Sequence, residues 1–275
     1  MPPRRAAICA IARNEAPYVA EWAAYHRILG FDQILVYENE STDDTAAVLQ
    51  TLEERGWLRA LPWTAPPRAH AQRLAYRDGL RRLRRGFAWV ALIDLDEFIV
   101  LPQHASIHDL LADFPDHDAI AMNWKVFGTS GHEQHEPGLV LERFQRCARL
   151  AHSGNHTIKT LARPRSIFKP NVHNHSFKSG VEYRTVLGES IPPNVGKSRL
   201  VSHDVIRVNH YFTKSREEWE AKVGRGRATK PVGHPDKHRR KEHFEMHNRN
   251  EDQERDVQRL IPVVKEKLAT LTVPA

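Results

Sequence analysis

The chain has 275 residues, of which 40% are hydrophobic and 27% are charged, and this composition favours one large globular α/β domain over a disordered chain. Lysine and arginine outnumber aspartate and glutamate by 41 to 34, so the formal net charge is +7. Such a balance favours an anionic partner: nucleic acid, an anionic membrane face or a small diphosphate. No apolar run approaches the roughly 20 residues of a membrane span, and segment 1–15 lacks the apolar core of a signal peptide. We expect a cytoplasmic protein, and peripheral association with the inner face of a membrane stays open.

Cysteine and histidine spacing predicts neither a disulfide framework nor a zinc site. Cys9 and Cys147 lie far apart without CxxC spacing, so we expect two buried, reduced thiols. The 17 histidines show no HExxH pattern.

The first hundred residues alternate between apolar strands and amphipathic helices. Strands are expected over 6–12, 33–38, 57–61 and 87–93, and helices over 18–29, 41–55 and 69–85. This alternation predicts a mostly parallel sheet with right-handed crossovers, an architecture that binds nucleotides. No GxGxxG or GxxxxGK[ST] motif follows any strand, so a metal and side chains would have to hold a nucleotide's phosphates.

From residue 119 the pattern becomes mixed. Strands are expected over 120–126, 139–144, 159–161, 166–169 and 207–211, and a helix begins over 216–222. A basic loop follows at 224–227, and segment 236–271 reads as two mostly polar helices. The basic runs at 81–85 and 237–241 are interpreted as solvated helix faces.

The fourth strand ends in three carboxylates, Asp94, Asp96 and Glu97. Alternation along a strand would place Asp94 and Asp96 on one side and Glu97 on the other. Two neighbouring carboxylates at the end of a buried strand repel each other unless a cation lies between them, and Mg²⁺ or Mn²⁺ prefers such oxygen ligands. The alternative is an ordinary acidic turn that caps a helix.

Several motifs, in order, resemble those of GT-A glycosyltransferases, most closely the family-2-like and family-92-like groups. They are Arg13-Asn14-Glu15, Glu21-Trp22, Tyr25-His26, the segment from Val36 to Asp43, and Asp94-Leu95-Asp96-Glu97-Phe98. Asn123-Trp124, Phe127-Gly128, His210-Tyr211 and Lys214-Ser215 extend the resemblance over most of the chain. It implies a GT-A fold: a nucleotide-sugar-binding half over 1–118, an acceptor-binding and catalytic half of the same domain over 119–235, and a helical extension over 236–275.

The resemblance also implies roles for individual residues. Asp94 and Asp96 match the family's DxD and would hold Mn²⁺ or Mg²⁺, with His210 as a further ligand. The positions expected at the nucleotide and its phosphates are Arg13, Asn14, Glu15, Glu38, Asn39, Gln72, Arg73, Asp94 and Lys214. Glu38 is one methylene longer than the more common aspartate. Asp43 is interpreted as a helix cap.

Other positions keep two interpretations. Lys214, Lys222, Arg225 and Arg227 could close over the diphosphate around Gly224 and Gly226, or could form a solvated basic loop. Gln72 and Arg73 could equally lie on an exposed helix face, and His210 could be an ordinary buried histidine. The resemblance would place Trp124 against the sugar, but a buried core residue is the favoured interpretation, and His173 and His175 either line the acceptor cleft or stabilise a loop.

The catalytic base is predicted to be Glu133, with His132 beside it and Asp204 as another candidate, because an inverting transfer needs a group that takes the acceptor hydroxyl's proton.

With the resemblance, these observations predict a metal-dependent transferase acting from a nucleotide-diphosphate sugar, favoured to be a UDP-sugar; inversion at the anomeric carbon is what the resemblance to family 2 implies. The acceptor would be a hydroxyl of a growing saccharide or a lipid-linked molecule. A metal-dependent nucleotidyltransferase or phosphohydrolase is the alternative, although no further carboxylates for two-metal chemistry are evident. A basic nucleic-acid-binding protein would rest on the net charge alone, and the ordered acidic cluster argues against it. The oligomeric state stays open.

Overall fold

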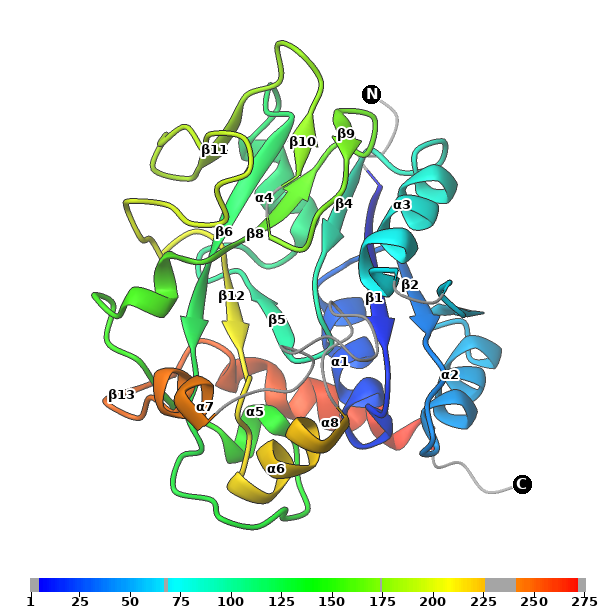
Figure 1. Cartoon of the computed structure of the whole chain (residues 1–275), viewed down its shortest axis with the longest axis vertical. Coiled ribbons are helices and arrows are strands. Elements are labelled where there is room, and N and C mark those ends of the chain that lie inside the picture. The colour runs from blue at the N-terminus through cyan, green and yellow to red at the C-terminus, as the bar shows by residue number, and fades with distance from the viewer. Residues whose placement is uncertain (1–4, 67–68, 174, 226–240, 272–275) are drawn as a thin grey trace.

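A computed structural model describes residues 5–66, 69–173, 175–225 and 241–271 of the chain. Its centre is a nine-stranded sheet in the order β3-β2-β1-β4-β8-β6-β12-β5, with β11 added beside β6 (Figure 1). The strands of this sheet are β1 (Ala6–Ala12), β2 (Gln33–Glu38), β3 (Arg59–Pro62), β4 (Trp89–Leu92), β5 (Glu97–Val100), β6 (Ala119–Val126), β8 (Ile158–Ala162), β11 (Tyr183–Thr185) and β12 (Arg207–His210). Two small sheets pair β9 (Ile167–Lys169) with β10 (Ser176–Phe177), and β7 (Arg146–Cys147) with β13 (Asp252–Gln253).

The helices follow the expected order in the first half of the chain. They are α1 (Ala16–Ile28), α2 (Thr45–Glu54), α3 (Ala71–Leu83), α4 (Ile107–Asp113), α5 (Val140–Arg143), α6 (Arg216–Arg225), α7 (Lys241–His247) and α8 (Ile261–Ala269), with single 3-10 turns at Ser153–His156 and Gln258–Leu260. Within the described residues, no helix has the length and apolar character that crossing a membrane would require.

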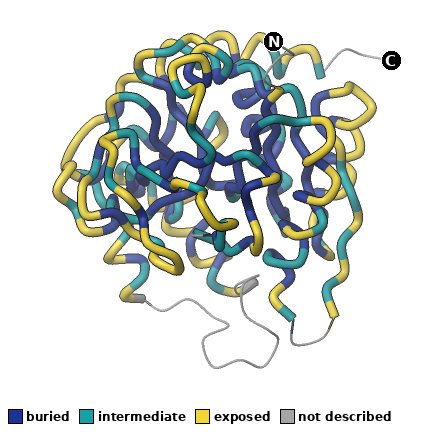
Figure 2. Tube along the Cα trace, turned by 90° about the horizontal axis from the view of Figure 1, so that it is seen from above, coloured by how far each residue is buried: buried dark blue, intermediate teal, exposed yellow. Residues whose placement is uncertain are grey.

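The pleat of β1 divides the core into two layers. Ile8 and Ala10 pack on one face with α1, α2 and α8, whereas Cys9 and Ile11 pack on the other face with α3. The buried trace therefore runs through the middle of the molecule, with exposed segments around it (Figure 2). Cys9 and Cys147 are free, buried thiols, as expected from the sequence.

Strand directions decide which side chains meet at one edge of the sheet. β1, β2, β3 and β4 are parallel, and β8 runs antiparallel to both β4 and β6. β12 is parallel to β6, so the carboxyl ends of β4, β6 and β12 lie at the same edge as the first residues of β8. This edge, which we call the carboxyl edge, is where open α/β sheets bind ligands.

Gly79 lets α3 approach β1 closely. A Cβ at this position would overlap the Sγ atom of Cys9 and touch the ring of Tyr37. A glycine inside a helix costs about 0.5–1 kcal/mol relative to alanine. The close approach sets the position of the N-terminal turn of α3, which carries Gln72.

Two expectations about secondary structure are wrong. Segment 139–144 was expected to be a strand, but it contains the short helix α5. The Glu21 carboxylate on α1 accepts hydrogen bonds from the N–H groups of Val140 (2.7 Å) and Leu141 (3.0 Å), so a distant residue supplies the helix cap. Asp94, Asp96 and Glu97 were also expected to alternate as they would along a strand that ends near residue 93. Instead β4 ends at Leu92, a turn carries Asp94 and Asp96, and Glu97 opens β5.

The remaining elements differ mainly at their ends. β3 begins two residues later than expected, at Arg59, and α3 is shorter than the expected 69–85. In the described part of segment 236–271, α7 and α8 are the two expected helices, with β13 between them.

Candidate active site

Asp94 lies at the carboxyl edge and is held from two elements. The Gln72 side-chain amide donates a hydrogen bond to its Oδ1 atom, and the Tyr76 hydroxyl lies 3.3 Å from the same oxygen. The Lys159 Nζ atom, from the start of β8, is 2.9 Å from Oδ2. Both carboxylate oxygens of Asp94 therefore already accept hydrogen bonds. The helix that carries Gln72 does bring a polar group to the acidic turn, rather than presenting this residue to solvent.

Asp96 is buried and is paired with a lysine from α6. Its Oδ2 atom lies 2.5 Å from the Nζ atom of Lys222, which also donates to the carbonyl of Phe212 at 2.8 Å. The His210 Nε2 atom, from the end of β12, is 3.8 Å from Oδ1 of Asp96. Burial alone would raise the pKa of Asp96, but the charge of Lys222 above all, together with that of Lys214, holds that pKa well below its ordinary value.

Glu97 is buried and holds the turn that carries Asp94 and Asp96. Its carboxylate accepts hydrogen bonds from the Asp94 N–H group (2.9 Å) and from the Trp124 indole (2.9 Å), and Lys159 lies 3.2 Å away. Burial raises the pKa of Glu97 to about 8, although the Lys159 charge opposes the shift. For Lys159, burial lowers the pKa, but the Asp94 and Glu97 charges outweigh it and raise the value to about 12. The buried ammonium of Lys159 thus ties the acidic turn to the second half of the chain.

His210 lies in an aromatic setting. Its ring stacks on Trp124 with 3.9 Å between ring centroids, and Phe212 and His247 also lie close to it. Burial holds the pKa of His210 well below its usual range, so the ring is neutral. Among the described residues its Nδ1 atom has no hydrogen-bond partner. Trp124 is buried, as the core interpretation expects.

The donor atoms at this edge are of the types that a hard divalent cation binds, but they are not grouped around a common point. Asp96 and His210 offer an oxygen and a neutral imidazole, which Mn²⁺-type ions accept. Within the described part of the chain, however, no three acidic, histidine or cysteine residues are arranged to hold a metal ion. The Lys222 ammonium instead lies against Asp96, and Asp94 is fully engaged. In the described structure, lysine ammonium groups rather than a shared cation therefore neutralise the two aspartates.

The loop after β1 is tied to the loop after β2. The Asn14 side-chain oxygen accepts a hydrogen bond from the Thr42 N–H group at 2.8 Å, and the Asn14 N–H group donates to the Ser41 hydroxyl at 3.0 Å. Glu38 accepts from the Ser41 N–H group at 2.7 Å. The Asp43 carboxylate accepts a hydrogen bond from the Thr45 N–H group at 3.0 Å, but the N-cap of α2 is Asp44, so Asp43 shapes the turn before the helix rather than capping it. Asn14 and Glu38 therefore shape the loops at this edge of the sheet.

A pocket of 310 Å³ lies between this loop and α6. It is lined by Asn14, Pro17, Tyr18, Asp43, His135, Thr213, Lys214, Glu217, Glu218, Ala221 and Lys222. The Lys214 ammonium lies 3.9 Å from the centre of the Tyr18 ring and 4.0 Å from Oε2 of Glu15. The backbone of Lys214 has φ +53°, a left-handed conformation that is uncommon for a residue with a long side chain. The structure thus places Asn14 and Lys214 in the lining of one pocket, with Glu15 beside Lys214 and with Asp96 paired to the lining residue Lys222.

The predicted base lies elsewhere. The Glu133 side chain is 71% exposed and pairs with Arg216, the first residue of α6, at 3.1 Å. His132 lies 3.0 Å from the Arg143 carbonyl through Nε2 and 3.1 Å from Glu136 through Nδ1. Arg216 precedes Lys222 by about two helical turns, so this loop sits at the opposite end of α6 from Asp96. Asp204 is exposed and precedes β12, at the edge of the sheet away from His210.

The remaining predicted site residues are buried or half-buried, or they stabilise loops. Asn39 is buried, with its N–H group bonded to the Ala12 carbonyl, and Arg13 and Arg73 are half-buried. His175 accepts the Asn171 N–H group and stabilises its loop, whereas His173 packs edge-on against Trp124. The Arg225 side chain, Gly226 and Arg227, expected in a closing loop, lie outside the described residues.

Among the buried ion pairs that sequence reasoning missed, two adjoin the candidate site. Lys159 is the single charged residue in the apolar segment Ile158–Ala162, and that isolation was the available signal. Arg143 forms a two-pronged pair with Glu218, at 3.0 and 3.1 Å, and the Tyr18 hydroxyl donates to the same carboxylate at 2.6 Å. These three residues are far apart in sequence, and no local pattern joins them.

A mostly parallel sheet with helices packed on both faces, as described above, has the architecture of the GT-A class of glycosyltransferases. The family model described as glycosyltransferase family 92 matches residues 6–249. The chain belongs to glycosyltransferase family 92, which confirms the resemblance drawn from its motifs.

Similar proteins include family 92 members from plants. A family 92 protein of Oryza sativa subsp. japonica is 27% identical over 214 residues, covering 74% of this chain and 32% of the relative. One from Ricinus communis is 25% identical over 234 residues, covering 82% and 39%. The chain thus spans about a third of the length of these relatives.

Among solved structures, S. aureus TarS 1-349 in complex with UDP is similar over 58% of this chain and 47% of its own, with TM-score 0.37 and 15% identity. Glucosyl-3-phosphoglycerate synthase from Mycobacterium tuberculosis, in complex with Mg²⁺ and UDP, is similar over 60% and 58%, with TM-score 0.36 and 15% identity.

Proposed function

We propose that this chain transfers a sugar from a nucleoside-diphosphate donor, with UDP as the nucleotide, to a hydroxyl group of a saccharide or lipid-linked acceptor. The observation that carries the proposal is the acidic turn of Asp94 and Asp96 at the carboxyl edge, faced by Lys159, Lys222 and His210. Membership of family 92 supports it. The site has the mixture of buried negative and positive charge that a metal-bound diphosphate would require.

Asp96 and His210, with Asp94, would hold a divalent cation, which when bound neutralises charge on the leaving diphosphate. Lys222, whose ammonium pairs with Asp96, would have to give up that contact for a cation to bind. Lys214, which lies in the same pocket as Lys222, would bind diphosphate oxygens from the α6 side. Glu97 and Lys159 would keep the turn in position, since both are buried beneath it.

The nucleoside would bind over the loops after β1 and β2. Arg13, Asn14, Glu15, Glu38 and Asn39 all lie at the carboxyl edge, where a nucleotide crosses an open parallel sheet. The bonds between the two loops fix their shape before a ligand arrives, which lowers the entropy lost on binding.

The acceptor hydroxyl's proton would pass to Glu133, with inversion at the anomeric carbon. Its exposed carboxylate is available to a solvent-facing acceptor, and it pairs with Arg216. His132 would steady that loop through the Arg143 carbonyl. For Glu133 to act, its loop would have to approach the donor when the acceptor binds.

Binding of UDP and GDP, measured by calorimetry with and without Mn²⁺, tests the donor site. We expect UDP to bind in the presence of Mn²⁺ and Asp96→Asn to abolish that binding while the protein stays folded. The matched control is Asp204→Asn, which removes an exposed carboxylate at the opposite edge and should bind as the wild type does. Equal nucleotide binding by Asp96→Asn and the wild type would contradict the proposal.

Product analysis separates the reaction classes. Incubation with a UDP-sugar and a saccharide acceptor should yield UDP and an extended saccharide. Release of UMP, or of free sugar at the same rate with and without acceptor, would instead identify a hydrolase.

A further inference from the structure

The outer face of α3 carries a row of arginines that neither the fold nor the donor site uses. Arg73, Arg77, Arg81 and Arg84 follow one another at intervals of four, four and three residues, which places them on one side of the helix. Like charges at such spacing destabilise a helix by roughly 0.2–0.5 kcal/mol per pair. Asp78 neutralises part of this charge through Arg81 and Arg82, at 2.6 and 2.5 Å. The row therefore carries a cost that packing does not explain.

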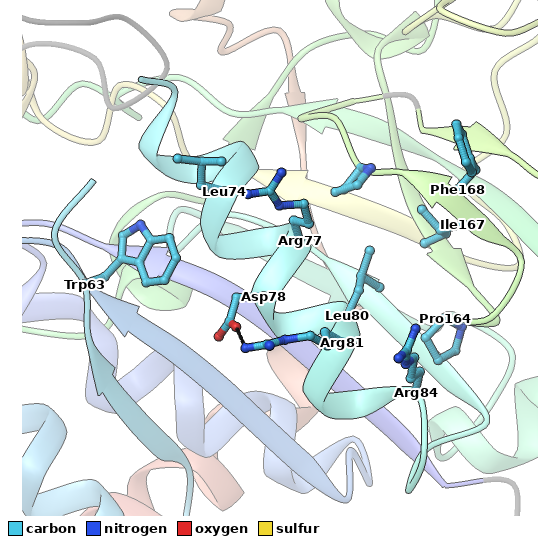
Figure 3. Close-up of a pocket in the computed structure, with 11 residues that line it drawn as sticks. Trp63, Leu74, Arg77, Asp78, Leu80, Arg81, Arg84, Pro164, Ile167 and Phe168 are labelled. Atoms are coloured by element: carbon cyan, nitrogen blue, oxygen red, sulfur yellow. Dashed lines mark hydrogen bonds and ion pairs between the residues drawn. The ribbon is translucent and has the colours of Figure 1, made fainter. Parts of the chain in front are cut away.

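These arginines line two adjoining pockets rather than a flat surface. The larger pocket, of 520 Å³, lies over the exposed face of α3, between Trp63 on one side and Pro164, Ile167 and Phe168 on the other (Figure 3). The smaller, of 240 Å³, continues toward the N-terminus of α3 and includes His70, Arg73 and Lys169. Leu74, Arg77 and Pro170 line both pockets, so the two join. Together they form what we call the α3 groove.

The α3 groove ends next to the proposed donor site. Arg73 lies in the smaller pocket, and its neighbour Gln72 bonds Asp94 at the carboxyl edge. From Arg73 to Arg84 the helix rises about 16 Å, so the groove is long enough for a short chain of sugars. After Lys169 and Pro170 the chain leads to His173, which packs on Trp124 beside His210. A polymer that continues beyond the groove, past the N-terminus of α3, would therefore be directed toward the carboxyl edge.

The lining combines positive charge with aromatic rings. Phe168 is 75% exposed, and Trp63 is fixed by its indole bond to the Ala71 carbonyl at 3.2 Å. Aromatic faces bind the apolar faces of sugars, and arginine binds carboxylates in a two-pronged geometry. Among the described residues the only acidic side chain in the lining is Asp78, which is already paired with Arg81.

We propose that the α3 groove binds a carboxylate-bearing glycan, as the extended part of the acceptor. This rests on the proposed function, because only a transferase would present an acceptor chain here. A concave surface with a single strongly exposed aromatic residue offers little apolar area for insertion into a bilayer. Continuity with the donor site also favours a saccharide over nucleic acid.

Direct binding of oligogalacturonate, measured by calorimetry at low salt, tests the groove without requiring any transfer. We expect the wild type to bind it, and Arg77→Gln/Arg84→Gln to bind at least about tenfold more weakly. Added salt should weaken the wild-type binding, because exposed charges are screened. The matched control, Arg55→Gln/Arg149→Gln, removes the same charge from exposed positions outside the groove and should bind as the wild type does. Phe168→Ser should also weaken binding.

The comparison ligands decide the identity of the partner. Neutral galacto-oligosaccharide of the same length should bind more weakly than oligogalacturonate. Tighter binding of oligo(dT) or of phosphatidylserine vesicles than of oligogalacturonate would overturn the proposal, as would equal affinity of the Arg77→Gln/Arg84→Gln variant and the wild type. UDP binding with Mn²⁺ should be unchanged in that variant. Loss of glycan binding with intact UDP binding therefore locates the effect in the groove, whereas failure of UDP binding in every protein would contradict the donor site instead.

Discussion

Replacing Lys222 with methionine should destabilise the protein in the absence of divalent cations and make it more responsive to them. The change removes the ammonium 2.5 Å from the buried Asp96 carboxylate but keeps most of the side chain's apolar volume. Removing one partner of a buried ion pair lowers the free energy of unfolding by about 3–5 kcal/mol. The Lys214 charge still stabilises the ionised Asp96, so we expect the lower end, about 3 kcal/mol. For a chain of this size the melting temperature should fall by about 6–12 °C.

Mn²⁺ should then reverse much of the loss. In the variant no ammonium competes for Asp96, and a ligand at about 100 times its Kd stabilises the folded state by about 2.7 kcal/mol. In the wild type the same concentration should stabilise less, because the cation must first displace Lys222. Urea denaturation with EDTA and with Mn²⁺, on both proteins, measures all four free energies of unfolding.

The control for this experiment is Lys265→Met. Lys265 lies 2.5 Å from Glu142, but its side chain is 57% exposed, so its loss should cost less than about 1 kcal/mol and leave the Mn²⁺ response unchanged. The reasoning is refuted if Lys222→Met is as stable as the wild type in EDTA. It is also refuted if Mn²⁺ stabilises the wild type and the variant by the same amount.

Three further predictions concern packing, pH and catalysis. Gly79→Ala should destabilise the protein by about 1–3 kcal/mol because its methyl group overlaps the Cys9 thiol. In a double-mutant cycle, Cys9→Ala should recover part of this loss, whereas strictly additive effects of the two substitutions on stability would argue against the contact. Burial lowers the pKa of His26 to about 3, so its contribution to stability is complete above about pH 6.5 and declines by about 2 kcal/mol between pH 6.5 and 5. Urea midpoints at both pH values should show a smaller decline for His26→Leu than for the wild type, and parallel declines would exclude this histidine. Glu133→Gln should lower kcat at least about 100-fold with unchanged UDP binding, whereas Asp204→Asn should not, and a fully active Glu133→Gln would remove Glu133 as the base.

The donor half could be predicted from the sequence because its signals are local. Each strand is a continuous apolar run, each helix has its own breakers, and Asp94 and Asp96 follow directly on the strand that places them. Parallel neighbours then determine that the ends of β1, β2 and β4 gather at one edge. Local patterns thus suffice where elements succeed one another in sequence and in space.

The partners of those carboxylates could not be predicted, because they come from distant parts of the chain. Lys159 reaches Asp94 only because β8 runs antiparallel beside β4 and begins at the carboxyl edge. Lys222 was expected near the diphosphate, but its pairing with Asp96 depends on how α6 packs. The helix over Val140–Arg143 depends similarly on Glu21, more than a hundred residues earlier, which caps it. An apolar run such as Leu139–Phe144 cannot by itself distinguish a strand from a buried helical turn.

The position of β8 has a consequence for exchanging parts between members of this family. β8 belongs to the second half of the chain by sequence, but it lies between β4 and β6, and its Lys159 neutralises Asp94 and Glu97 of the first half. A chimera joined near residue 118 would combine an acidic turn from one parent with a buried lysine strand from another. Any mismatch would leave an unpaired charge in the core, so such a hybrid should fold only when both parents share this lysine. Chimeras intended to change acceptor specificity should instead take β4 and β8 from the same parent and exchange the surface segments around them.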